Sequence, residues 1–219
     1  MVTVELVERL RQVDSCAVSD ASDRLKLPAA VTGLRPCSVR QRIAGRVRTV
    51  TLGPAQGAVA TRHLCTAAIE AAERGDIIVI EQRTGIDAAG WGGILSLGAH
   101  VKGLSGVIVE GPARDIDEAI ALGFPVYARS ETARTARGRI MEIATGEPVT
   151  IGETKVRAGD CVIADSSGVV FIAAENAERV IAEAERIASR EGAMAQAARE
   201  GQPIATVMGA DYERLLGHK

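Results

Sequence analysis

Aromatic residues and excess charge are both scarce in this chain. Its 219 residues include one Trp, two Tyr and two Phe, and 26 Lys and Arg against 28 Asp and Glu give a formal net charge of −2. Proteins that bind single-stranded nucleic acid stack bases on several aromatic side chains, and proteins that bind polyanions carry a clear basic excess. We therefore expect no nucleic-acid partner.

Long apolar runs and paired cysteines are missing as well. The charged, amphipathic segment 1–15 lacks the apolar stretch of a secretory signal, and no run approaches the roughly 20 residues of a membrane helix. We expect a cytoplasmic protein that binds no membrane. Four cysteines are widely separated, without a CxxC pair, and predict reduced, buried thiols rather than a zinc site: Cys16, Cys37, Cys65 and Cys161.

The remaining composition is typical of a globular protein. Hydrophobic residues make up 47% and charged residues 25% of the chain. The length suits one core, which Ala, Val, Ile and Leu must fill because aromatics are few. We predict a single domain over residues 1–219.

The middle of the chain has the clearest secondary-structure pattern. Continuously apolar strands are predicted over 76–81, 106–110 and 124–128, and they alternate with helices over 91–102 and 115–122. Such strands indicate a parallel sheet that is covered on both faces. Elsewhere we expect helices over 3–12, 15–25 (capped by Asp14 or Ser15), 61–74 and 175–199, a strand over 43–52, and hairpins within 137–173. The fold class is α/β, with a central parallel βαβαβ unit, C-terminal β-hairpins and a long C-terminal helix.

A candidate site follows from this topology. Loops 82–90 and 111–114 leave the sheet at its carboxyl edge, where open α/β folds bind ligands. One is followed by a glycine-rich helix start, Gly90-Trp-Gly-Gly-Ile-Leu95, whose unpaired amides suit an anion. The other contains Arg114, a planar fork for a carboxylate or phosphate, and Asp115, a hard oxygen ligand for Mg²⁺ or Mn²⁺.

Each of these residues also has a purely structural interpretation. Asp115 and Glu118 resemble a helix capping box, Arg114 suits a solvated surface, and the glycines suit close packing. His63 and His100 are expected at the surface or partly buried, without a partner. Four arginines form a run that is expected to be a solvated face, with anion or subunit binding as the alternative: Arg129, Arg134, Arg137 and Arg139.

The central motifs resemble a known family. Trp91-Gly-Gly-Ile-Leu95, followed by Gly103-Leu-Ser-Gly-Val-Ile-Val-Glu-Gly-Pro-Ala-Arg-Asp115, is similar to the core motif of the RraA-like family. Ser19-Asp-Ala21, Ile43-Ala-Gly-Arg-Val47, Ala158-Gly-Asp160 and Asp165-Ser-Ser-Gly-Val-Val170 also occur in the family's order. That family includes 4-hydroxy-4-methyl-2-oxoglutarate / 4-carboxy-4-hydroxy-2-oxoadipate aldolases and non-enzymatic regulators of ribonuclease activity. The resemblance implies an α/β/α sandwich with swivelling-domain topology, assembled as homotrimers or hexamers.

The resemblance also implies a chemistry and the residues that perform it. The aldolases are class II enzymes that use a divalent metal to cleave a 4-hydroxy-2-oxo acid to pyruvate, and oxaloacetate decarboxylation passes through the same enolate. By this resemblance Asp115 would ligate Mg²⁺ or Mn²⁺, and Arg114 would bind the pyruvyl oxygen and stabilise the enolate. The turn formed by Gly92, Gly93, Ile94 and Leu95 would bind the substrate, with the last two amides on the carboxylate. Glu191 would reach the metal's waters from a neighbouring subunit.

Two positions depart from the family pattern. Gly93 stands where the aldolases often carry an acidic residue that helps proton transfer, and Asp87 is a candidate replacement. Glu110 precedes Gly111 where the family usually has Asp. Two alternatives therefore stay open, a non-enzymatic protein-binding regulator and a lyase or isomerase of another 2-oxo acid.

Overall fold

The computed structural model describes residues 2–27, 30–58 and 62–209. The chain begins with two short helices, α1 (Val4–Arg11) and α2 (Ser15–Arg24), as expected. The side chain of Thr3 accepts a hydrogen bond from the amide of Leu6 and begins α1. Asp14 accepts one from the amide of Ala17 and begins α2, so Asp14 is the cap of the second helix.

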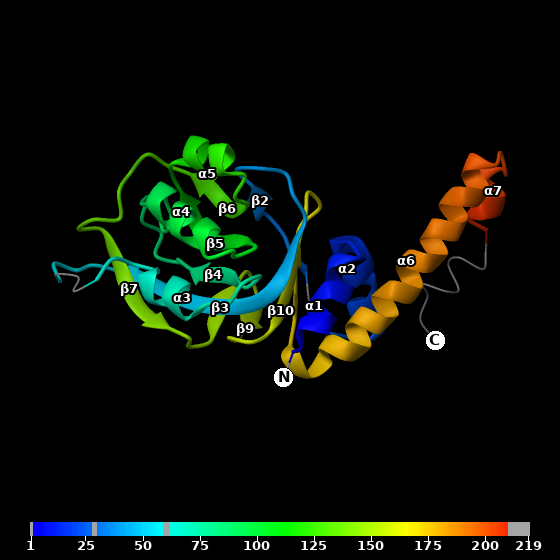
Figure 1. The fold of residues 1–219 in the computed structure, drawn as a ribbon, viewed down its shortest axis with the longest axis horizontal. Coiled ribbons are helices and arrows are strands. Elements are labelled where there is room, and N and C mark those ends of the chain that lie inside the picture. The colour runs from blue at the N-terminus through cyan, green and yellow to red at the C-terminus, as the bar shows by residue number, and fades with distance from the viewer. Residues whose placement is uncertain (1, 28–29, 59–61, 210–219) are drawn as a thin grey trace.

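A curled nine-stranded sheet forms the centre of the molecule (Figure 1). Its longest strand, β3 (Ile43–Pro54), pairs in parallel with β4 (Ile77–Glu81), which is followed by β5 (Gly106–Ala113) and β6 (Val126–Glu131). On its other side β3 pairs antiparallel with β10 (Cys161–Ala164), and then come β11 (Val169–Ile172) and β1 (Ala30–Val31). The short β2 (Arg35–Pro36) pairs with β6, β7 (Ile140–Thr145) pairs with β3, and β8 (Val149–Ile151) forms a separate hairpin with β9 (Thr154–Val156).

Helices cover one face of the parallel strands. In Figure 1, α3 (Thr66–Ala71), α4 (Gly93–Val101) and α5 (Ile116–Leu122) lie on this face. Alternate strand residues such as Ile78, Ile80 and Val107 point into the core that they share with these helices. Their neighbours Ile77 and Val79 point to the other face and pack against residues of β8, β9, β10 and β11.

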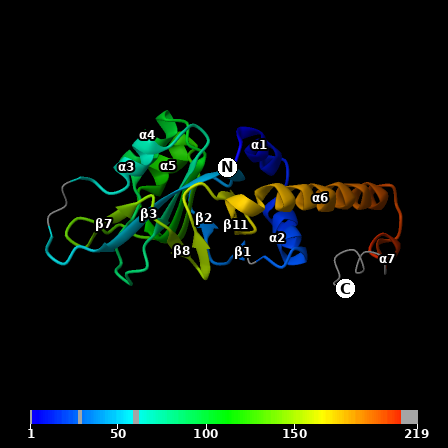
Figure 2. The same cartoon turned by 90° about the horizontal axis from the view of Figure 1, so that it is seen from below.

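The remaining helices pack outside the antiparallel strands. The 3₁₀ turn Ala174–Asn176 leads into α6 (Ala177–Arg199), and the short α7 (Ile204–Val207) follows. Residues at helical spacing bury the first half of α6 against α1, α2, β10 and β11: Ala177, Val180, Ile181, Ala184 and Ile187. Figure 2 shows the rest of α6 extending away from the sheet.

The α/β fold, the parallel βαβαβ unit and the long C-terminal helix are confirmed. The second face of the parallel strands, however, is covered by antiparallel strands of the curled sheet and by the separate β8–β9 hairpin. Hairpins form at β8–β9 and β10–β11, whereas β7 pairs with β3 instead of a sequence neighbour. Strand β5 continues to Ala113, so the loop expected at 111–114 is mostly strand.

Helix α3 is shorter than the predicted 61–74, and residue 61 lies outside the described residues. Cys65 precedes it in a left-handed conformation (φ 66°), with its amide bonded to the Glu142 carboxylate at 2.6 Å. The helix ends before Ala72, whose backbone is extended. Glu142 on β7 therefore binds the backbone just before α3, a contact between distant segments that no local residue signals.

Two of the four cysteines are buried, as predicted, and two are not. Cys65 and Cys161 are buried, but Cys37 is only partly so and Cys16 is exposed. Burial raises the pKa of the Cys161 thiol to about 12 and that of Cys65 well above its usual value. Among residues 2–27, 30–58 and 62–209, no helix is both long and apolar enough to cross a membrane.

Candidate functional site

The two glycine-containing segments singled out in the sequence meet at the carboxyl edge of the parallel strands. Trp91 forms a parallel bridge with Ala113, and the amide of Arg114 donates to the carbonyl of Trp91 at 3.0 Å. The amide of Gly90 donates to the carbonyl of Pro112 at 2.9 Å. This backbone pairing brings the start of α4 beside Arg114 and Asp115, as parallel topology predicts.

The first turn of α4 presents free backbone donors. Gly92 is the N-cap residue and offers no side-chain acceptor. The amides of Ile94 and Leu95 belong to the first turn and have no acceptor within the helix. Trp91 anchors this turn, because its buried indole donates to Ser96 Oγ at 2.8 Å and its ring stacks on Phe124 with centroids 6.4 Å apart. Such a turn is suited to an anion.

Asp115 has an unusual backbone conformation. Its φ of 55° and ψ of 43° are left-handed, which is uncommon for a residue other than glycine and costs on the order of 1 kcal/mol. Its side chain makes no capping bond to α5, so the capping-box interpretation with Glu118 is wrong. The carboxylate instead accepts from the amide of Gly93 at 2.9 Å and from Arg114 Nε at 3.0 Å. The conformation turns Asp115 toward α4, away from its own helix.

The glycines serve this arrangement through close packing. A Cβ on Gly92 would lie 2.8 Å from Asp115 Oδ2 and 3.4 Å from Arg114 Cγ. A Cβ on Gly90 would lie 2.3 Å from Oε1 of Gln82, a buried side chain whose Nε2 donates to the carbonyl of Ala88 at 2.6 Å. The packing interpretation of these two glycines is therefore confirmed, and at Gly92 the packing is against the Arg114–Asp115 pair itself.

A cleft of about 230 Å³ opens in front of these residues. Its lining combines the α4 turn, Arg114 and Asp115 with residues from two other segments: His63, Thr135, Ala136 and Arg137. A second cavity of about 480 Å³ shares His63, Leu64 and residues 135–137 and continues toward Met141 and Glu142. His63 and Arg137 come from segments distant in sequence, so only the fold brings them to the cleft. The arginine run was the one signal that could have found Arg137.

The other predicted residues lie outside the cleft. Arg129 is not part of a solvated face, because it forms a bidentate pair with the buried Glu110, with Nη2 2.8 Å from Oε2. Asp87 pairs with Arg134 at 3.3 Å and does not line the cleft. An acidic residue that replaces the one missing at Gly93 would have to line it.

Glu191 lies on α6, in a separate part of the chain from α4 and α5 (Figure 1). Burial and the nearby carboxylates of Asp14 and Asp20 raise its pKa. Within one chain it is therefore near Asp14 and Asp20 and does not line the cleft that contains Asp115. Its predicted approach to a neighbouring subunit's metal stays a prediction.

The donor set around Asp115 fits only one kind of metal site. The described part of the chain holds no group of three or more His, Cys, Asp or Glu side chains arranged around a metal. Mg²⁺ usually keeps several waters and binds through one or two carboxylates together with substrate oxygens. The Asp115 side chain is 30% exposed to the cleft side and, although each oxygen accepts one hydrogen bond, each keeps a further lone pair. Asp115 thus fits an open, largely hydrated Mg²⁺ or Mn²⁺.

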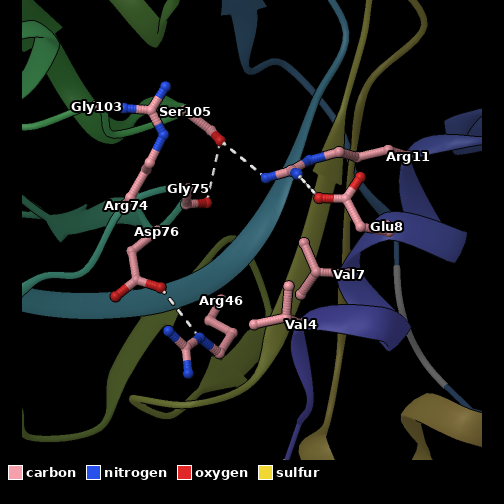
Figure 3. Close-up of a pocket in the computed structure, with 10 residues that line it drawn as sticks. All are labelled: Val4, Val7, Glu8, Arg11, Arg46, Arg74, Gly75, Asp76, Gly103 and Ser105. Atoms are coloured by element: carbon pink, nitrogen blue, oxygen red, sulfur yellow. Dashed lines mark hydrogen bonds and ion pairs between the residues drawn. The ribbon is translucent and has the colours of Figure 1, made fainter.

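A different cavity, of about 380 Å³, lies at the opposite, amino edge of the strands (Figure 3). Its buried Asp76 is bonded by Arg46 Nε at 3.1 Å and, from outside the view, by Arg48 Nε at 2.7 Å. Arg11 pairs with Glu8 on the same helix. The Asp76 pairs join β3 to the start of β4, and Arg11 joins α1 to β3 through a bond from its Nε to the carbonyl of Ala44 at 3.3 Å, so we assign the charges a structural role. His100 is exposed on α4 and lines a neighbouring cavity, also away from Asp115.

The sequence of this chain is similar to a known protein family. A family model described as "RraA-like: Aldolase/RraA" matches residues 15–171. The chain belongs to the RraA-like family. A protein of Halalkalibacterium halodurans named "Putative 4-hydroxy-4-methyl-2-oxoglutarate aldolase" is 26% identical over 187 residues, which are 84% of this chain and 83% of that protein. Two other curated relatives are matched over only part of their length, 29% of one and 58% of the other.

Solved structures of RraA-like proteins share the fold. An uncharacterized protein from Pseudomonas syringae superposes with a TM-score of 0.85 at 23% identity, covering 95% of this chain and 98% of the other. Streptomyces coelicolor RraAS2, described as an unusual member of the RNase ES inhibitor RraA protein family, has a TM-score of 0.78 at 23% identity and covers 87% of this chain and 96% of its own. RraA-like relatives thus carry both aldolase and inhibitor names, and the fold alone does not choose between them.

Proposed function

We propose that this RraA-like protein is a divalent-metal-dependent lyase that cleaves a 4-hydroxy-2-oxo acid to pyruvate. The observation that carries the proposal is the left-handed Asp115, whose carboxylate meets the first turn of α4 and Arg114 within one cleft. Strained residues concentrate where function requires a particular direction of a side chain. A helix cap would not need this conformation, and Asp115 makes no capping bond.

The cleft residues suit the charges of a retro-aldol reaction. The free amides of Ile94 and Leu95 would bind the carboxylate of the pyruvyl half. Arg114, 36% exposed and oriented by Asp115, would donate to the 2-oxo oxygen and stabilise the enolate charge that develops there. Mg²⁺ or Mn²⁺ held by Asp115 would act as a Lewis acid toward the same oxygen.

A second arginine supports an anionic substrate. Arg137 also lines the cleft, and the described residues provide no carboxylate within 4 Å of its guanidinium. Two guanidinium groups and one carboxylate, that of Asp115, therefore line a cavity of about 230 Å³. We infer a substrate with a second acidic group beyond the pyruvyl half, in agreement with the dicarboxylate in the name of the H. halodurans relative.

Two alternatives are kept because of Gly93, which lacks the acidic side chain common in the aldolases. One is a lyase or isomerase of another 2-oxo acid, which would share the enolate. The other is a protein-binding regulator, a role carried by the name of the S. coelicolor relative. The regulator alternative does not require a metal at Asp115.

The first experiment measures pyruvate release, coupled to NADH oxidation, from 4-hydroxy-4-methyl-2-oxoglutarate and from oxaloacetate. Assays contain Mg²⁺, Mn²⁺ or a chelator, and Mn²⁺ binding is measured separately by electron paramagnetic resonance. We expect metal-dependent turnover, and we expect Asp115→Asn to lower it by at least about 100-fold and to weaken Mn²⁺ binding. Asn tolerates the left-handed conformation and keeps an acceptor for the Gly93 amide, so the fold should persist.

Asp117→Asn is the matched control, since Asp117 is exposed in the first turn of α5 and does not line the cleft. Its turnover and metal affinity should equal those of the unsubstituted protein. An Asp115→Asn protein with unchanged turnover would refute the site assignment. Metal binding without turnover of either substrate would favour another 2-oxo acid, and no metal binding would favour the regulator.

We further propose that the chain forms a homo-oligomer, as a trimer or hexamer. Helix α4 exposes Ile94 (83%), Leu97 (44%) and Val101 (78%) along one side. Apolar side chains at this spacing form a stripe that is typical of a subunit contact. Sedimentation equilibrium should therefore give a mass above the 22.9 kDa of one chain.

A further inference from the structure

The proposed retro-aldol reaction requires a base, and the cleft offers few. The C4 hydroxyl of the substrate must lose its proton as the C3–C4 bond breaks. Gly93 has no side chain to accept it. Among the described residues that line the cleft, four carry ionisable side chains: His63, Arg114, Asp115 and Arg137. Arginine stays protonated in proteins, and Asp115 is the proposed metal ligand, which leaves His63.

The tautomer of neutral His63 is fixed by its own backbone surroundings. Its Nδ1 lies 3.1 Å from the carbonyl oxygen of Leu64. A carbonyl oxygen can only accept, so Nδ1 must carry the hydrogen. In the neutral ring Nε2 then holds the lone pair, and this is the form that accepts a proton. No described residue provides a hydrogen-bond partner for Nε2.

The backbone that follows His63 is held by two hydrogen bonds, although the imidazole itself is exposed. Thr66 Oγ1 donates to the carbonyl of His63 at 2.8 Å. Two residues after His63, the amide of Cys65 is bonded to Glu142, whose side chain is 5% exposed. A base on a fixed backbone that lines the same cleft as the proposed substrate carboxylate site has the positioning that proton transfer needs.

Other carboxylates near the cleft are less well placed. Asp87 is paired with Arg134 and does not line the cleft. Glu118 is close to the empty position, with its Cβ 3.4 Å from a Cβ built on Gly93, but its side chain is exposed on α5 and it does not line the cleft either. Glu118 is therefore the main competitor to His63 and enters the test below.

We propose that His63 is the general base of this lyase, and this role rests on the proposed function. Nε2 takes the proton of the C4 hydroxyl, and the O–H electron pair becomes the π bond of the new carbonyl. The C3–C4 bond breaks, and its electron pair forms the C2=C3 bond of the pyruvate enolate, with the negative charge on the C2 oxygen beside Arg114. The imidazolium returns the proton to C3, which yields pyruvate, a second carbonyl product and neutral His63.

The test compares two reactions at the same site. Retro-aldol cleavage needs the base, whereas oxaloacetate loses CO₂ to the same enolate without removal of a hydroxyl proton. His63→Gln should therefore lower the retro-aldol kcat by about 10²- to 10⁴-fold. The same variant should keep the rate of oxaloacetate consumption within about twofold, because the groups that stabilise the enolate are unchanged. That retained activity also shows that the variant is folded.

His100→Gln is the matched control, a histidine on α4 that lines a different cavity, and it should alter neither reaction. Equal loss of both reactions in His63→Gln, or loss of neither, would overturn the base assignment. So would a selective retro-aldol loss in Glu118→Gln with normal His63→Gln kinetics, or decarboxylation without retro-aldol turnover in the unsubstituted protein. If that protein catalyses neither reaction, the proposed function itself fails, and the role of His63 fails with it.

Discussion

The hydrogen bond between Trp91 and Ser96 gives a quantitative test of how the α4 turn is held. Ser96→Ala removes the acceptor of the indole Nε1–H, which lies 2.8 Å from Ser96 Oγ in a residue that is 1% exposed. Leaving a buried donor without a partner costs about 1–3 kcal/mol. Alanine recovers about 0.5 kcal/mol through its higher helix propensity. The carbonyl of Gly92 loses the Ser96 hydroxyl but keeps the Ser96 amide at 3.0 Å, so it adds little.

We therefore expect Ser96→Ala to lower the free energy of unfolding by about 1–2 kcal/mol. Urea unfolding can be followed by the fluorescence of Trp91, the only tryptophan, and independently by far-ultraviolet circular dichroism. Ser189→Ala is the control, because Ser189 is an exposed residue inside α6 and its change should stay within about 0.5 kcal/mol. A Ser96→Ala effect no larger than the control would refute the view that this hydrogen bond fixes the turn.

Two further predictions concern ionised side chains away from the cleft. Arg129→Met should lower the free energy of unfolding by about 3 kcal/mol, since it leaves the Glu110 side chain, which is 10% exposed, without its cation. Adding Glu110→Gln to this variant should recover part of the lost free energy, as measured by urea titration. No recovery would contradict the charge argument. Burial alone would raise the pKa of Asp165, but bonds from the amide and hydroxyl of Ser15 and the amide of Ser167 outweigh it, so that the pKa is lowered from 3.8. A carboxylate whose pKa is lowered by folding stabilises the folded state at pH values above its pKa in the unfolded chain, and this contribution is lost as the pH falls through its pKa in the folded state. The decrease in Tm caused by Ser15→Ala should therefore be full at pH 7 and shrink below about pH 4. A decrease in Tm that is constant with pH would contradict this prediction.

Local patterns were sufficient for the parts of the fold that depend on local spacing. The apolar strand from Ile77 and the helix that ends at Gly123 follow from periodicity and capping, and both occur as predicted. The pairing of β7 with β3 and the short α3 were not predictable in this way. Both depend on contacts between segments far apart in sequence, such as that of Glu142 with the Cys65 amide.

In the candidate site, too, the features that depend on local sequence were predictable and those that depend on distant contacts were not. Arg114 and Asp115 are adjacent in sequence, and the parallel topology was enough to place them beside the start of α4. The left-handed backbone of Asp115 was hidden, because Asp before a helix is equally compatible with an ordinary cap. His63 carried no signal at all, since its neighbourhood in the cleft is created by the loop before α3 and by the segment 135–137.

The triple pairing of β3 has a consequence for how the chain is made. The middle of β3 pairs with β4 and its end with β7, but Ala44, Gly45 and Arg46 pair with β10, which is made much later. On the ribosome this partner emerges on the order of a hundred residues later, and closing so long a loop is slow. Until then the nascent chain exposes an unpaired strand edge to other chains. Release of β10 from the exit tunnel thus allows this edge of β3 to be covered and ends its exposure to other chains.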